Sequence, residues 1–479
     1  MSAPVISIAQ MRAWEDATWQ TGQTEDEVIY RVGQIVARRA LELTMPGQGI
    51  LLLAGKGHNG DDARAACEHI LDRRVDLLKV DSPTDDLPGL EAALGQKPSL
   101  IVDGLFGIGL NRPLDEAWQA FIERVNASGI PVLAVDVPSG LNADTGATYG
   151  AAVCAAITLA VGAPKTGMLA PGAEQFVGRL EVATDIGLVK CPEASELQWI
   201  LPRDFLRFPP RRPTSSHKGS YGHLAILAGS VGYHGAAVLA TRGAQRAQPG
   251  LITLFTHEPA YHVVASQLQA AMVKVWNTNQ KIGTDYDAAL IGPGLAAPDV
   301  ADDLKLVARK IWRDSLQPVV VDATALDWLP LEPVPRNCIR VITPHPGEAA
   351  RLLKCSVAQV QANRLHAVRE ISKRFGQCWV VLKGHQTLIG RHAGEVLVNS
   401  SGNPHLAQGG SGDLLAGYIA GLLVQPELQS NLAQTLGYAV WQHGAAADSL
   451  QTRRPNWIIE DLAEEIGNAL PPDHPFSPR

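Results

Sequence analysis

Short apolar runs rich in β-branched residues alternate with segments of helical periodicity along the whole chain. In the first half these runs are GILLLA, VDLLKV, SLIVDGLFG, PVLAVDVPSG, AAITLAVGAPK and RLEVATDIG, and each ends in glycine or polar residues. This alternation predicts a mostly parallel sheet whose strands are joined by helical crossovers. Ligands of such sheets bind at the carboxyl ends of the strands, which is where the polar residues lie.

A stretch after Leu201, PRDFLRFPPRRPTSSHKG, is dense in proline, arginine and serine, as connections between domains often are. The alternation then restarts with GHLAILAGS, LITLFT, AALIGPG, PVVVDATAL, VITPHPGE, WVVLKGHQT and EVLVNS. A chain of 479 residues also exceeds what one hydrophobic core usually serves. We therefore predict two α/β domains, over residues 1–205 and 210–479.

Composition narrows the cellular setting of the protein. Its six cysteines form no C-x-x-C pair, which favours reduced thiols and a cytoplasmic location. A net charge of -7 argues against nucleic acid or an anionic membrane as the main partner. The start MSAPVISIAQMRAWEDA has no basic leader, and the uncharged run Gly146 to Pro164 fits a buried helix and strand better than a membrane span. We expect a homo-oligomer with neither nucleic-acid nor membrane partners.

The second half contains a pattern that binds anions. Gly409, Gly410, Ser411 and Gly412 precede an apolar helix, so their N–H groups can converge at its positive end around a phosphoryl group. Asp413 follows at the start of the helix. A carboxylate beside an anion site is costly unless it acts as a base toward the hydroxyl that attacks the phosphoryl group. Alternatively, Gly, Ser and Asp only cap the helix.

Further motifs follow the predicted strands of this half. KGHQT supplies a lysine and a hydroxyl suited to nucleotide phosphates, and TPHPGE holds a histidine between two stiffening prolines. These motifs lie in the order KGSYGHLAILAGSVGYHGAAVLATRGAQRAQPGLITL, GPGL, TPHPGE, KGHQT and GNPHLAQGGSGDLLAG. In this order the second half resembles, over essentially its whole length, the nucleotide-dependent NAD(P)H-hydrate dehydratases of the ribokinase-like superfamily.

This resemblance implies a repair reaction. Hydrated NADH or NADPH carries a new hydroxyl, which is phosphorylated with ADP or ATP and Mg²⁺, and loss of phosphate restores the reduced dinucleotide. It implies that Asp413 is the catalytic base, and that Ala236, Gly294, His345 and Asp413 bind the hydrate. The nucleotide would be bound by Lys383, Gly384, His385, Gln386, Thr387 and Gly412. The chain departs from the family at His405, Leu406 and Gln408, where Gly, Met and Ser or Thr are usual.

The first half contains LLLAGKGHNGDDA, a G-x-G-x-x-G at Gly55, Gly57 and Gly60 directly after an apolar run. Taken alone, this loop is weak evidence for a dinucleotide held at a helix N-terminus. The amide and carboxylates of HNGDD suit a cation or a polar ring better than a pyrophosphate.

With VDGLFGIGLNRPL, DVPSGLNADTG, GAPKTGMLAPG and DIGL, this loop resembles the NAD(P)H-hydrate epimerases, which are often fused ahead of the dehydratase. The resemblance implies a Rossmann-like domain ahead of a ribokinase-like one. It implies that K⁺ is held by Asn59, Asp103 and Ser139. The hydrate would be bound by His58, Asn59, Gly60, Asp61, Asp62, Gly107, Ile108, Gly109, Leu110, Asn111, Arg112, Pro113 and Asp136.

Two departures from the epimerase pattern bear on activity. Asp61 replaces a glycine of the usual N-N-G-G-D, which adds bulk and charge where a backbone should approach the ligand. Arg31, in YRVG where E-N-A-G is usual, would add a cation near the potassium site. We expect the fold to survive and epimerisation to be weakened. The alternatives are a noncatalytic dinucleotide-binding module in the first half and a small-molecule kinase in the second.

Overall fold

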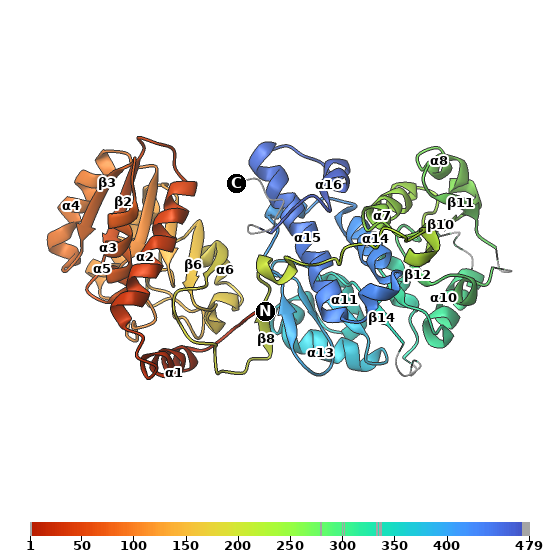
Figure 1. Cartoon of the computed structure of the whole chain (residues 1–479), viewed down its shortest axis with the longest axis horizontal. Coiled ribbons are helices and arrows are strands. Elements are labelled where there is room, and N and C mark those ends of the chain that lie inside the picture. Colours follow the sequence, from red (N-terminus) through yellow and green to blue (C-terminus); the bar gives the residue numbers. More distant parts are fainter. Residues whose placement is uncertain are drawn as a thin grey trace. The chain divides into compact units, whose positions relative to one another are not determined.

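The computed structural model describes residues 2–277, 280–298, 300, 302–331, 334 and 338–471. The chain forms two compact units, Ala3–Glu196 and Leu197–Arg479 with Met1–Ser2 (Figure 1). No described helix has the length and apolar character needed to cross a membrane.

The first unit is built on a parallel sheet in the order β3-β2-β4-β5-β6-β7. The strands are β2 (Gly49–Ala54), β3 (Arg74–Lys79), β4 (Leu100–Gly104), β5 (Val132–Val135), β6 (Ile157–Val161) and β7 (Arg179–Ala183), with β1 (Ala3–Pro4) outside this sheet. The helices are α1 (Ile8–Trp19), α2 (Glu25–Glu42), α3 (His58–His69), α4 (Pro83–Gly95), α5 (Glu116–Ala127), η1 (Thr166–Leu169) and α6 (Glu174–Val177). Every apolar run predicted as a strand in this half is confirmed.

Alternate residues of β2 enter different cores, as expected for a sheet that is covered on both faces. Ile50 and Leu52 pack with residues of α2 and α3, whereas Leu51 and Leu53 pack with residues of α4 and α5. The strand order changes direction between β2 and β4, because β3 lies on one side of β2 and all later strands on the other. Ligands of open α/β sheets bind at such a switch point.

Local structure in the run Gly146 to Pro164 differs from the sequence prediction. The run supplies β6, but residues 151–155 are irregular and the predicted helix is absent from this described segment. The side chain of Asn126 explains the extended path, because it donates to the carbonyl of Ala152 and accepts from the N–H of Cys154, both at 2.9 Å. These bonds replace the intrahelical ones.

The second unit has a sheet in the order β8-β17-β16-β15-β14-β13-β12-β9-β10-β11. Its strands are β8 (Leu197–Trp199), β9 (His223–Leu227), β10 (Leu251–Thr256), β11 (Met272–Val275), β12 (Ala288–Ile291), β13 (Val319–Val321), β14 (Arg340–Ile342), β15 (Trp379–Leu382), β16 (Leu388–Gly390) and β17 (Val396–Val398). Strands β15 to β11 in this order are parallel, and only β16 runs antiparallel to its neighbours. The sequence places the domain boundary at residues 205–210, but β8 already belongs to this sheet because it pairs with β17.

The helices of this unit are α7 (His234–Arg246), α8 (Tyr261–Ala265), α9 (Ile282–Asp285), α10 (Asp302–Asp314), α11 (Pro346–Leu353), α12 (Val357–Ala362), α13 (Arg364–Arg374), α14 (Ser411–Leu423), α15 (Leu432–Arg453) and α16 (Ile459–Glu465). The 3-10 segments are η2 (Pro202–Phe205), η3 (Lys218–Tyr221), η4 (Glu258–Ala260), η5 (Ala323–Trp328), η6 (Pro404–Leu406) and η7 (Pro426–Gln429).

Helix α14 is buried on every side from Leu414 to Leu423, which explains its uniformly apolar sequence. Its glycines allow α7 to approach closely: a methyl group added at Gly417 would lie 1.8 Å from the carbonyl oxygen of Ala240. This tight packing fixes the N-terminus of α14 at the carboxyl ends of the central strands.

Candidate active sites

The predicted anion site of the second unit lies at the start of α14. Gly410 is the N-cap with φ 94°, a left-handed conformation that favours glycine, and an added methyl group would lie 2.4 Å from Leu239 Cδ1. Asp413 follows in the first turn, so its carboxylate lies beside the helix N–H groups that have no intrahelical partner.

The charges around Asp413 set its proton affinity. Burial and the neighbouring carboxylate of Asp322 raise the pKa of Asp413 to about 7, against the lowering effect of Lys383, and Glu348 raises it further. A carboxyl group with this pKa accepts a proton efficiently near neutral pH. The environment therefore suits the base predicted at this position and not a simple capping residue.

Lys383 follows β15 and reaches the same helix start. A methyl group added at Gly412 would lie 3.1 Å from Lys383 Nζ, so the ammonium group is in the first turn of α14. Its Nζ donates to Asp322 Oδ1 at 2.8 Å and lies 4.0 Å from Glu348 Oε2. The ammonium group of Lys383 is thus held by carboxylates. The other residues of KGHQT have different contacts.

The remainder of KGHQT forms a loop that Arg364 of α13 supports. Its guanidinium donates to the carbonyl oxygens of His385, Gln386 and Leu382, the last two at 3.3 and 3.2 Å. The Thr387 hydroxyl donates within the loop to the carbonyl of Gly384 at 3.0 Å. Gly384 and His385 are exposed, which leaves this edge of the loop open to a ligand.

His345 follows β14 and is the N-cap of α11. Its Nδ1 accepts from the N–H groups of Gly347 and Glu348, at 3.0 and 3.4 Å, so the neutral ring carries its proton on Nε2. His345 therefore has a structural role as a helix cap. Half of the side chain remains exposed, at 52%, and its Nε2 lies 3.5 Å from Glu348 Oε1.

Ala236 and Gly294 are brought together by α7 and the segment after β12. A methyl group added at Gly294, where φ is 67°, would lie 2.9 Å from Ala236 Cβ and 2.5 Å from the carbonyl oxygen of Tyr233. Position 294 therefore requires glycine, both for its φ and for the close approach of α7 beside the switch point between β9 and β12.

Several residues at this site have no role in the sequence prediction. Asp322 and Thr343 follow β13 and β14, and the Thr343 hydroxyl donates to Asp322 Oδ1 at 2.6 Å. His443 of α15 lies 3.5 Å from the Ser411 hydroxyl and stays neutral, because burial lowers its pKa to about 4. Asp322 in DATAL and Thr343 in TPHPGE could have been predicted from the sequence, because each is a polar residue directly after a central strand. No local sequence pattern indicates a role for His443.

In the first unit, Asn59, Asp103 and Ser139 meet at the switch point between β2 and β4. The carboxylate of Asp103 accepts from the Ser139 hydroxyl at 2.6 Å and from the Ser139 N–H at 2.9 Å. Asn59 donates to the carbonyl of Phe106 at 3.0 Å, and all three predicted residues are buried. Burial raises the pKa of Asp103 despite its bonds to Ser139.

The loop from Gly107 to Pro113 follows β4 and borders this set, because a methyl group added at Gly107 would lie 3.3 Å from Asn59 Oδ1. Its residues from Asn111 to Pro113 are exposed, and the loop contains no helix or strand. Such a loop can change its path around a ligand without disturbing the sheet.

Asp136 ends β5 in a left-handed conformation, with φ 62°, which is uncommon outside glycine. Its Oδ1 accepts from the ammonium of Lys165 and from the N–H of Val161, the latter at 3.0 Å. Lys165 of the GAPK motif is completely buried. Burial raises the pKa of Asp62 well above its ordinary value, and the negative charge of Asp136 adds to this effect.

The residues that depart from the epimerase pattern have partners. Asp61 accepts from Arg64 at 2.6 Å, and Arg64 also donates to the carbonyl of Gly55 at 2.9 Å. His58 Nδ1 lies 3.0 Å from Glu25 Oε1. The guanidinium of Arg31 lies beside Gly187 after β7, whereas the predicted potassium ligands gather at β4 and β5 with β6 between. The structure thus places Arg31 near the end of β7, and its effect on the potassium set stays a prediction.

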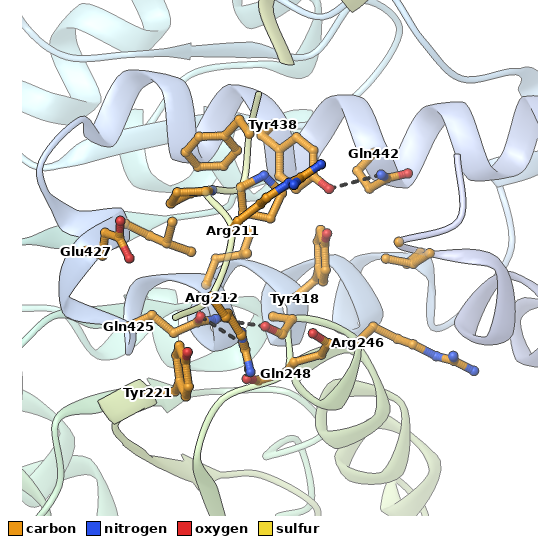
Figure 2. A pocket seen from close by; sticks show the side chains of 18 of the residues that line it. Arg211, Arg212, Tyr221, Arg246, Gln248, Tyr418, Gln425, Glu427, Tyr438 and Gln442 are labelled. Carbon is orange, nitrogen blue, oxygen red and sulfur yellow. Dashed lines mark hydrogen bonds between the residues drawn. The ribbon is translucent and has the colours of Figure 1, made fainter. Parts of the chain in front are cut away.

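A cavity of about 810 Å³ lies at the opposite end of α14 and is lined in part by Tyr418 and Gln425 (Figure 2). Its arginines do not converge. Arg212 donates to the carbonyl of Gln248 at 2.5 Å and to Gln425 Oε1 at 3.1 Å, and Figure 2 shows Arg246 pointing away from it. No predicted site residue lines this cavity, so its size alone does not make it an active site.

Both units are similar to known proteins. The family described as NAD(P)H-hydrate dehydratase matches residues 224–472, and the family described as YjeF-related protein N-terminus matches residues 66–167. The bifunctional NAD(P)H-hydrate repair enzyme of Coxiella burnetii is 33% identical over 470 residues, which cover 92% of this chain and 93% of that protein. The corresponding enzyme of Gloeobacter violaceus is 34% identical, covering 94% of each chain.

A crystal structure of a ribokinase-like superfamily protein from Enterococcus faecalis is 25% identical, with a TM-score of 0.50, and the match covers 58% of this chain and 97% of that one. The predicted ribokinase-like fold of the second half is thereby confirmed. Because similarity to the repair enzymes extends through both units, the chain belongs to the family of bifunctional NAD(P)H-hydrate repair enzymes.

Proposed function

We propose that this chain repairs hydrated NADH and NADPH. The second unit dehydrates the S hydrate at the expense of ADP or ATP, and the first unit interconverts the R and S hydrates. One observation carries the dehydratase assignment: Asp413, with a pKa of about 7, lies with the ammonium of Lys383 at the N-terminus of α14.

The dehydration proceeds in two steps that this site supports. In the first step, Asp413 takes the proton of the substrate hydroxyl. The hydroxyl oxygen bonds to the terminal phosphorus of the nucleotide, and the P–O bond between that phosphorus and the departing nucleotide breaks. Phosphate then leaves the ring with the electrons of the C–O bond, and loss of a proton from the neighbouring carbon restores the ring double bond. The helix N–H groups and Lys383 stabilise the charge that develops on the phosphoryl oxygens.

The nucleotide lies along the KGHQT loop, with its phosphates toward Gly412 and Lys383. Within the described residues, no three His, Cys, Asp or Glu side chains are grouped to hold a metal. Mg²⁺ would enter with the nucleotide, mostly on phosphate and water, and would supply positive charge that offsets that of the phosphates. Ala236, Gly294 and His345 bind the hydrated dinucleotide at the switch point.

In the first unit, K⁺ would be held by Asn59, Asp103 and Ser139. The set offers an amide oxygen, a hydroxyl and a single carboxylate, and the carbonyl of Phe106 lies within 3.0 Å of the Asn59 amide. Oxygen ligands with little net charge suit a large monovalent cation. The hydrate then binds between the loop after β4 and Asp136.

Epimerisation depends on how Asp61 affects this site. The ion pair between Asp61 and Arg64 offsets the negative charge of the carboxylate. The Asp61 side chain still adds bulk beside the ligand. We expect Asp61→Gly to accelerate epimer exchange, and Arg64→Met to slow it by freeing the carboxylate to compete for K⁺. Exchange is followed with K⁺ and then with Na⁺. Equal rates in Asp61→Gly and the unmodified protein would show that the aspartate is tolerated.

The overall reaction is tested by incubating the pure protein with mixed hydrate epimers and ADP, and then with ATP. We expect complete recovery of NADH absorbance, faster than spontaneous epimerisation, with release of phosphate. Recovery that stops at the S fraction would mean a noncatalytic first unit, and a stable phosphate ester would identify a small-molecule kinase. We also propose a cytoplasmic location, in keeping with cysteines that are all free. A homo-oligomeric state is a separate proposal.

A further inference from the structure

Asp322, in the DATAL motif after β13, has a buried carboxylate without a role in the function proposed above. It is 1% exposed and accepts from Thr343 Oγ1 at 2.6 Å and Lys383 Nζ at 2.8 Å. Although Asp322 precedes η5, its side chain makes no capping hydrogen bond to that segment. A simple turn-capping aspartate is therefore excluded, and the carboxylate is used across strands.

Burying a carboxylate is costly unless it is paired, and a pair buried only for stability is often replaceable by apolar residues. Here one partner, Lys383, lies beside the first turn of α14. The ammonium group of Lys383 lies against position 412, since a methyl group added at Gly412 would lie 3.1 Å from its Nζ. The lysine stem arrives from the end of β15, where its N–H donates to the carbonyl of Pro344 at 2.9 Å.

We propose that Asp322 is a positioning residue that acts through Lys383, holding the ammonium group against the first turn of α14 where the transferred phosphoryl group lies. This inference rests on the proposed function of the second unit. Without Asp322, a lysine side chain with several rotatable bonds would lose its hydrogen-bonded carboxylate and keep only the weaker attraction of Glu348, at 4.0 Å, and of Asp413.

The pair also has an electrostatic consequence for the base. Burial lowers the pKa of Lys383, but the carboxylates of Asp322 and Glu348 raise it by more, so the ammonium group stays charged. The charges acting on Asp413 are those of Asp322, Lys383 and Glu348, and His443 on α15 is neutral. Asp322 keeps the proton affinity of Asp413 high, so its removal should move the acidic limb of the rate profile to lower pH.

The test uses the full chain with Asp322→Asn, which keeps the size of the side chain and removes its charge. We expect ADP affinity, measured by calorimetry, to fall about tenfold, the scale of a charged hydrogen bond to phosphate. With the S hydrate, the acidic limb of kcat/KM should move down by roughly one pH unit. Asp327→Asn is the matched control, because Asp327 lies in η5 but pairs with Arg351 at the surface.

Thr343→Val is the second variant, since it keeps the charge of Asp322 and removes one of its two partners. We expect severalfold weaker ADP binding with an unmoved acidic limb. Unchanged ADP affinity in both variants, or an unmoved limb in Asp322→Asn, would overturn the positioning role. A protein that binds ADP as expected but never regenerates NADH would refute the proposed function alone, because ADP affinity tests the pair without the hydrate.

Discussion

Asp413→Asn should remove activity and stabilise the second unit, and the two effects share one cause. Burial, together with the negative charge of Asp322, raises the pKa of Asp413 from 3.8 to about 7. An asparagine has the same shape but accepts no proton. We expect the dehydration rate to fall roughly a hundred- to ten-thousandfold, the span of a lost general base.

The stability effect follows from the raised pKa. Each pKa unit corresponds to about 1.4 kcal/mol, so the ionised carboxylate destabilises the folded unit by up to roughly 4 kcal/mol above pH 7. Below about pH 4 the group is protonated in both folded and unfolded chains, and the penalty is absent. Because an amide needs its own partners, we expect Asn to recover roughly 1 to 2 kcal/mol at pH 8 and nothing near pH 4.

Denaturant unfolding of the variant and the unmodified protein at pH 4, 6 and 8 measures this directly, together with NADH recovery at each pH where the protein is active. In the unmodified protein, kcat/KM should rise with a midpoint near pH 7, because the base must be ionised. Near-normal turnover of Asp413→Asn, or a stability difference that is the same at pH 4 and pH 8, would refute the assignment of Asp413 as a base in a strained electrostatic environment.

Two further substitutions probe the sites separately. Gly412→Ala should weaken ADP binding severalfold, because its methyl group would lie 3.1 Å from Lys383 Nζ. A methyl group at Gly409 meets no atom within 4 Å, so Gly409→Ala should leave ADP affinity unchanged. Equal ADP affinities of the two variants in calorimetry would contradict this prediction. Lys165→Met leaves a buried carboxylate unpaired and should destabilise the first unit by about 3 to 5 kcal/mol in urea unfolding, while Lys56→Met removes only an exposed pair; similar unfolding midpoints would argue against the buried ion pair.

Local patterns in the sequence were sufficient for much of this protein. Each short, continuously apolar run predicts a strand of the first sheet, because successive residues such as Ile50 and Leu51 enter two different cores. Glycine followed by an apolar helix predicts the anion site at α14, since helix N–H groups and glycine conformation depend on neighbouring residues only. The ordered motifs then indicate the family, because each motif is short and keeps its spacing.

Contacts between distant segments required the tertiary structure. Asp322 and Lys383 are 61 residues apart, and they meet because β13 and β15 end at the same edge of the sheet. Asp136 and Lys165 are likewise distant in sequence and form an ion pair only in the folded chain. The position of Arg31 beside Gly187 also depends on tertiary structure. A sequence shows which residues carry charge. Which charges neutralise one another, and so which carboxyl group retains its proton near neutral pH, depends on the strand order and burial that only the folded chain provides.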